Sequence, residues 1–289
     1  MPFLLLSLSI ILSTGRNIFS KKISDVRFGT KSFFLYQGFL FLSGAAALIL
    51  FGKIQLTEIA ISTVIYAIIY ALLLIFAQWF YTAALADGNT GVCSTVYSMG
   101  FIFPTLSGAI LWSESFSVID ALGILSAVSA IAVSGLRHGP GANCKKSYYF
   151  VPLIIAMLSS GGLGILQKIQ QKSAYAEQKS IFLLIAFLLA AAISFTIAPA
   201  AKKHADSEPV SKKKIAVASS VGIFFGCCNL LNTTLAGLLP SAIFFPTLNI
   251  GSIFLSMLCG IILFKEKISK KEIAVLILGV ISIVLLNIG

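Results

Sequence analysis

Several polar side chains interrupt long apolar runs of the sequence, and their spacing indicates what they could do. Asn229, Asn232 and Thr233 are three and four residues apart, so a helix places them on one face, and Gln78 and Tyr81 share a face in the same way. Such groups either hydrogen-bond a small solute or bridge helices, at about 0.6 kcal/mol per bond. The candidates for lining a solute cavity are Arg16, Asn17, Gln78, Tyr81, Tyr97, Asn229, Asn232, Thr233 and Asn249.

Apart from Lys271 at the first position of the last span, Arg16 is the one basic residue inside a predicted membrane span. A charged side chain at the centre of a bilayer costs about 2.5–3.5 kcal/mol on insertion scales. Arg16 is four residues from the end of its apolar run, so its side chain could extend to the membrane surface. The alternative is a contact with an anion or a carboxylate of the solute. Lys22 and Lys168 are predicted to be anchors at the membrane surface.

Catalytic and metal-binding patterns are missing from the sequence. It contains no GxSxG, HExxH or GxxxxGK[ST] motif. Both histidines lie in basic loops, and four of the five cysteines lie in apolar runs as small hydrophobic residues. We therefore expect no enzyme activity, no metal and no cofactor. No carboxylate lies near the middle of a span, which argues against carboxylate-based coupling but leaves coupling to an ion or proton gradient open.

The overall composition is that of a membrane protein. Of the 289 residues, 58% are hydrophobic and only 11% are charged, against about 25% in a soluble domain. The net charge of +11 would suit nucleic-acid binding in a soluble protein, but in so apolar a chain basic residues mark loops beside the membrane. We expect a multi-pass protein of the cell (plasma or inner) membrane, with the lipid bilayer and a small-molecule substrate as partners and no nucleic acid.

Ten apolar runs are long enough to be membrane helices, which need about 20 residues each. Hydrocarbon offers no hydrogen-bond partners, so each run must form a helix. The fold class predicted is an all-α integral membrane protein. The predicted spans are residues 2–20, 32–51, 59–86, 90–113, 118–136, 149–167, 180–200, 215–237, 241–264 and 271–288.

The two halves of the chain show a weak internal repeat. Leu12-Ser13-Thr14-Gly15 aligns with Leu158-Ser159-Ser160-Gly161, and further on Glu114 aligns with Glu266. The same alignment pairs Tyr81 with Thr233, and Tyr97 with Asn249. We predict two five-helix repeats, residues 1–140 and 145–289. Because five is odd, the second repeat would be inverted in the membrane, as in many transporters.

Basic residues predict the orientation of the chain. Most Lys and Arg residues lie in the loops after the first, third, fifth, seventh and ninth spans. The positive-inside rule places those loops in the cytoplasm, with both termini outside.

The first predicted span resembles that of the EamA-like branch of the drug/metabolite transporter superfamily, which reads W-G-S-N-F-V-x-x-K. Here Gly15, Asn17 and Lys22 keep the pattern, Arg16 replaces the small polar residue, and Ser13-Thr14 replaces the tryptophan region. Later motifs of that family match Ala84-Leu85, Pro104 and Ser113-Glu114, with serine in place of glycine, and Lys265-Glu266 in the second half.

The resemblance covers nearly the whole chain and implies a ten-helix carrier with a central cavity. It implies transport of amino acids, nucleosides, sugars or drugs, often outward, and cytoplasmic termini, which conflicts with the distribution of basic residues. We expect a secondary transporter, or permease, that moves a small polar or amphipathic metabolite by alternating access. Two alternatives stay open: a flippase for a lipid-linked sugar, and a membrane scaffold or receptor that transports nothing.

Overall fold

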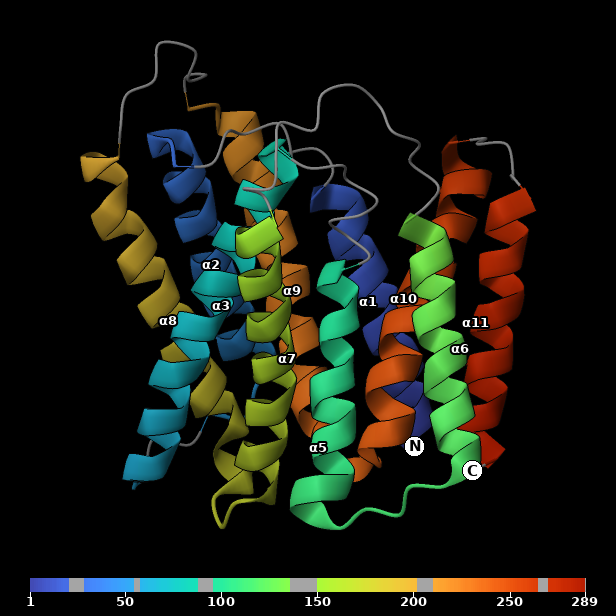
Figure 1. The fold of residues 1–289 in the computed structure, drawn as a ribbon. Coiled ribbons are helices and arrows are strands. Elements are labelled where there is room, and N and C mark those ends of the chain that lie inside the picture. Colours follow the sequence, from blue (N-terminus) through green and yellow to red (C-terminus); the bar gives the residue numbers. More distant parts are fainter. Residues whose placement is uncertain are drawn as a thin grey trace. The chain divides into compact units, whose positions relative to one another are not determined.

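The fold was obtained as a computed structural model that describes residues 1–20, 29–54, 58–87, 96–135, 150–201, 210–264 and 270–288 (Figure 1). Within these ranges the protein is all-helical and forms no strand. The helices in chain order are α1 (Pro2–Ser20), α2 (Lys31–Phe51), α3 (Ile61–Asp87), η2 (Met99–Phe101), α5 (Ile102–Trp112), α6 (Val118–Gly135), α7 (Phe150–Lys172), η3 (Ala176–Gln178), α8 (Lys179–Ile197), η4 (Ala198–Ala200), α9 (Lys212–Leu238), α10 (Ser241–Phe264) and α11 (Lys270–Ile288).

Short polar side chains define where several helices begin. The Thr30 side chain accepts a hydrogen bond from the Phe33 amide at the start of α2. Ser117 and Asp120 bond each other's backbone amides before α6, which satisfies two amides that have no partner within the helix. α5 ends at Ser113 in the left-handed conformation, with φ of 51°. The boundaries therefore follow ordinary capping chemistry.

Each of the ten apolar runs coincides with a helix. Six stretches are long and apolar enough to cross a membrane: Pro2–Ser20, Lys31–Phe51, Ile61–Ala84, Val151–Lys172, Ala176–Ala200 and Lys212–Leu238. The other four described apolar stretches are shorter: Val96–Trp112, Val118–Val133, Ser241–Ser256 and Ile277–Leu286. This composition is compatible with a multi-pass membrane protein. Ten crossings and an inverted repeat stay predictions, and the predicted boundary at residues 140–145 lies outside the described part of the chain.

The described chain divides into two compact units. Unit 1 comprises Met1–Leu6, Phe76–Ile165 and Leu235–Gly289, and unit 2 comprises Ser7–Ile75 and Leu166–Thr234. The points of division fall inside α1, α3, α7 and α9, so each of these helices contributes to both units. Each unit also takes segments from both halves of the sequence.

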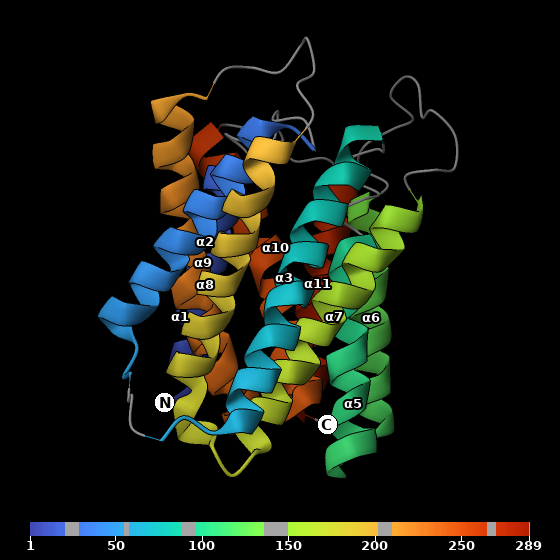
Figure 2. The same ribbon diagram turned by 90° about the vertical axis from the view of Figure 1, so that its left-hand side faces the viewer.

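Unit 2 is held together by close helix packing. α2 packs along α8, and the two lie side by side in Figures 1 and 2. α2 also crosses α9 at glycines, because a Cβ atom on Gly222 would collide with the Leu40 carbonyl oxygen and one on Gly226 with the Gly44 backbone. The GxxxG pattern of Gly222 and Gly226 therefore allows a close helix contact, as this pattern commonly does between membrane helices.

Unit 1 is held together by α6 and α11, which lie side by side in Figures 1 and 2, and by α10 against α5. Two serine hydroxyls join α6 and α11: Ser126 donates to the Leu278 carbonyl at 2.9 Å, and Ser282 donates to the Gly123 carbonyl at 2.8 Å. The Glu114 carboxylate accepts the Ser241 amide at 2.8 Å and so caps the start of α10.

Candidate functional site

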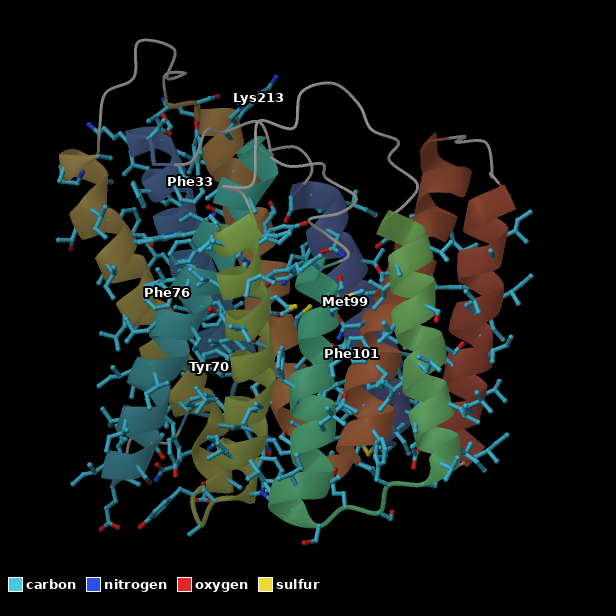
Figure 3. The ribbon with its side chains drawn as sticks, viewed as in Figure 1. Phe33, Tyr70, Phe76, Met99, Phe101 and Lys213 are labelled. Carbon is cyan, nitrogen blue, oxygen red and sulfur yellow. The ribbon has the colours of Figure 1, made fainter. Side chains whose placement is uncertain are left out.

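Three uncharged side chains from three helices meet in the interior of unit 2. The Tyr70 hydroxyl of α3 donates to the Asn229 Oδ1 of α9 at 2.5 Å. The Gln167 amide of α7 donates to the Tyr70 hydroxyl at 2.8 Å and to the same Asn229 oxygen at 3.2 Å. Tyr70 is fully buried, and Figure 3 labels it on α3. We call Tyr70, Gln167 and Asn229 the amide–phenol cluster.

The amide–phenol cluster lies deep along α9 and not at a helix end. Asn229 is 17 residues after the start of this 27-residue helix and also donates to the Phe225 carbonyl one turn earlier, at 2.8 Å. A helix rises about 1.5 Å per residue, so Asn229 is more than two turns from either end. Polar groups at this depth must satisfy one another or bind a solute, because lipid offers neither donors nor acceptors.

One turn further along α9, Asn232 and Thr233 have different surroundings. The Ser9 hydroxyl of α1 donates to the Asn232 Oδ1 at 2.5 Å. Thr233 is fully buried, and its hydroxyl has no hydrogen-bond partner among the described residues. The three residues of the predicted face therefore differ in their contacts. Asn229 bonds α3 and α7, Asn232 bonds α1, and the Thr233 hydroxyl is buried.

Arg16 of α1 lies half-buried against the middle of α9. Its guanidinium carbon is 5.0 Å from the centroid of the Phe225 ring, a cation–π distance. Phe225 is the central residue of α9, whereas Arg16 itself lies four residues before the end of α1 at Ser20. Its hydrogen bond within the described chain is to the Asn17 Oδ1 beside it, at 3.4 Å.

The neighbourhood of Arg16 is formed by α1 packing on α9. Phe19 and Phe224 stack with ring centroids 5.6 Å apart, and Gly15 lies beneath the Phe224 ring, where an added Cβ would approach to 3.2 Å. Ser13 and Cys228 are 3.5 Å apart through Oγ and Sγ, either of which can be the donor. Asn17 itself is exposed.

Lys168 differs from its prediction as a membrane-surface anchor. Its side chain is fully buried in unit 2 and has bonding partners of its own. α7 continues to Lys172, five residues beyond the predicted end of this span. The prediction was wrong because a lysine in sequence suggests a helix end, whereas this lysine is enclosed by protein.

The aromatic candidates lie in unit 1. Tyr81 of α3 and Tyr97 pack with ring centroids 4.5 Å apart and ring planes tilted by 38°. Tyr81 also packs on a small buried cluster of Ala84 and Leu153. Gln78, one turn before Tyr81, is half-buried. The two tyrosine rings provide flat apolar area, which suits contact with a planar solute.

Asn249 of α10, also in unit 1, donates to the Phe245 carbonyl one turn earlier at 2.9 Å. Two residues earlier on the same helix, the Thr247 hydroxyl is buried without a partner among the described residues. Asn249 is half-buried and forms no cross-helix bond that matches the one of Asn229.

The structure brings some of the predicted residues together and separates others. Arg16, Asn17, Asn229, Asn232 and Thr233 belong to unit 2, and Gln78, Tyr81, Tyr97 and Asn249 belong to unit 1. The predicted set did not include Tyr70, Gln167 and Ser9. Gln167 was the last residue of its predicted span, and Tyr70 sits in an otherwise apolar run, so neither could be recognised without knowing which helix faces which.

No metal centre is formed within the described ranges, since no group of three or more His, Cys, Asp or Glu residues lies close enough to hold an ion.

Comparison with known proteins identifies the fold alone. No family model matches the chain, and no curated protein matches it. One solved structure, described only as "Crystal structure of protein", is similar in fold with a TM-score of 0.78. The similarity covers 99% of this chain and 97% of that one at 16% sequence identity. The whole chain thus adopts an architecture that is known from experiment.

Proposed function

We propose that this protein is a secondary transporter of the cell membrane that moves a small polar or amphipathic metabolite by alternating access. The observation that carries the proposal is the set of polar groups near the middle of α9: the amide–phenol cluster, the Thr233 hydroxyl and the Arg16 guanidinium. Polar groups are costly at this depth of a membrane helix, and those kept there generally serve a solute or ion pathway.

The division of the helices into units agrees with such a mechanism. α1, α3, α7 and α9 each contribute to both compact units, and α7 carries Gly161, Gly162 and Gly164 just before its point of division at Ile165. Glycine lowers the helix propensity by about 1 kcal/mol, so this segment can bend at low cost. Carriers need such helices, because the two parts must move while the chain stays continuous.

The sequence resemblance to EamA-like carriers gives the proposal its substrate range: amino acids, nucleosides, sugars or drug-like solutes. Two inverted five-helix repeats and ten crossings belong to the same proposal. No metal, cofactor or nucleic acid is part of it.

Uptake into proteoliposomes tests the proposal. Purified protein should mediate saturable uptake of at least one labelled solute from a panel of these classes, above that of protein-free liposomes. Asn229→Leu should abolish this uptake, whereas Lys213→Gln, at the exposed start of α9 (Figure 3), should leave it unchanged. Uptake that never saturates, or that survives Asn229→Leu unchanged, would contradict the proposed function or its site.

A further inference from the structure

The position of Arg16 leaves a positive charge in an apolar part of unit 2. Phe225, which lies under the guanidinium, is 13 residues from either end of α9, or about 20 Å at 1.5 Å per residue. The charge is therefore far from both ends of the helix against which it packs. A guanidinium carries five N–H donors, and within the described residues this one forms a single long hydrogen bond, to the side chain beside it.

No carboxylate of the protein balances this charge in the described structure. Arg16 forms no ion pair with any residue of the described ranges. The six stretches long enough to span a membrane contain one carboxylate, Glu177, which is exposed at the second residue of its stretch. Arg16 is half-buried and has no carboxylate partner among the described residues, so an anion that binds from outside the chain can balance its charge.

The contact with Phe225 does not use up the hydrogen-bond donors of the guanidinium. An aromatic ring is not a conventional acceptor, so the N–H groups of Arg16 can still donate to a ligand. A planar edge of paired N–H donors matches the two oxygens of a carboxylate. One guanidinium also supplies one positive charge, which suits a singly charged carboxylate better than a doubly charged phosphate.

We propose that Arg16 binds the carboxylate of the transported solute, so that the substrates are organic acids with one negative charge. This inference rests on the proposed function and narrows it from small metabolites in general to carboxylate-bearing ones. Ser13, one turn before Arg16 on the same helix, and Asn17 offer hydrogen bonds to the polar remainder of such a solute.

Thermal unfolding of the purified protein with matched acid and amide probes tests the site. The pairs are acetate with acetamide, benzoate with benzamide, and 3-phenylpropionate with 3-phenylpropionamide, at constant pH and ionic strength. A ligand that binds only the folded protein raises the Tm. We expect at least one acid, and none of the amides, to raise the Tm of the wild-type protein.

Three variants make the test specific. Arg16→Gln should weaken the binding of the acid at least tenfold, Arg16→Lys should retain part of it, and Lys213→Gln should bind as the wild type does. The assignment is overturned if no acid raises the Tm, if the amide is as effective as its acid, if Arg16→Gln still binds, or if inorganic phosphate alone gives the shift.

Stability without any ligand separates a binding role from a structural one. Arg16→Met removes an uncompensated charge and keeps the apolar length of the side chain, so its Tm should equal or exceed that of the wild type. A clearly lower Tm would make Arg16 a structural residue and overturn the site. Uptake distinguishes the two proposals: acid binding without any uptake refutes the transporter alone, and saturable uptake unaffected by Arg16→Gln refutes the carboxylate site alone.

Discussion

The polar groups of unit 2 and unit 1 are placed in different ways. In unit 2 one group of them lies near the middle of α9, where Tyr70, Gln167 and Asn229 bond one another and Arg16 contacts Phe225. Others in this unit, such as Gln178, bond backbone groups at helix ends. In unit 1 the carboxylates of Glu114 and Asp120 cap the starts of α10 and α6. The serine hydroxyls that join α6 and α11 donate to backbone carbonyls.

This difference suggests that some polar groups stabilise the helix packing and others are available to bind a solute. A hydroxyl bonded to a carbonyl, or a carboxylate on a helix start, fixes neighbouring helices and has little left to offer a solute. The Arg16 guanidinium forms one hydrogen bond within the described residues, so its other N–H groups can donate to a solute. We therefore expect substitutions in the interior of unit 2 to change solute binding, and those at the capping groups of unit 1 to change stability alone.

The largest effect is expected at the crossing of α2 and α9 in unit 2. Gly226→Ala would drive a Cβ atom into the Gly44 backbone, which cannot rotate away as a side chain can. The cost should be about 3 kcal/mol or more, enough to lose the monodisperse peak in size-exclusion chromatography. The matched variant in unit 1 is Gly279→Ala, whose Cβ meets the movable Ile250 side chain at 2.9 Å. Equal losses in both variants would show that the α2–α9 crossing is not special.

A smaller but more informative effect is expected at Asn229. Asn229→Leu removes the acceptor shared by Tyr70 and Gln167 and should lower the free energy of unfolding by about 1–3 kcal/mol. It should also abolish solute-dependent shifts in Tm. Asn249→Leu in unit 1 loses only a bond to its own helix, so we expect a change below about 0.5 kcal/mol and retained binding. If Asn249→Leu abolished binding and Asn229→Leu did not, unit 1 would hold the recognition site.

An effect smaller than that of Asn229→Leu is expected at the helix cap of unit 1. Glu114→Ala leaves the Ser241 amide without its carboxylate and should cost about 1 kcal/mol, measured as a lower Tm in detergent. The affinity for solute should not change. A large loss of solute affinity with little loss of stability would place Glu114 in the recognition site and end the contrast between the units.

The sequence predicts the helices well because each depends on local apolar content. Within the described residues all ten predicted runs overlap helices, and the predicted start at residue 90 lies outside those residues. α7 continues five residues beyond its predicted end, past the buried Lys168. The tight crossing at Gly222 and Gly226 also follows from a local pattern.

The partners within the candidate site could not be predicted in this way. Asn229 stands out in an apolar helix, but its bonds to Tyr70 and Gln167 join segments 159 and 62 residues away. Such pairings depend on which faces of three helices meet, and hydropathy along one helix carries no such information. The contact of Arg16 with Phe225 could not be predicted either. The sequence is equally compatible with a side chain that extends to the membrane surface.

Counterflow in proteoliposomes is the most direct measurement of whether the polar interior of unit 2 carries a solute. Vesicles are loaded with an unlabelled solute and diluted into a trace of the same labelled solute. We expect the label to accumulate transiently above its equilibrium level with the wild-type protein and with Glu114→Ala, and not with Asn229→Leu. Slow equilibration without an overshoot, or an overshoot that Asn229→Leu leaves intact, would contradict a carrier that works through unit 2.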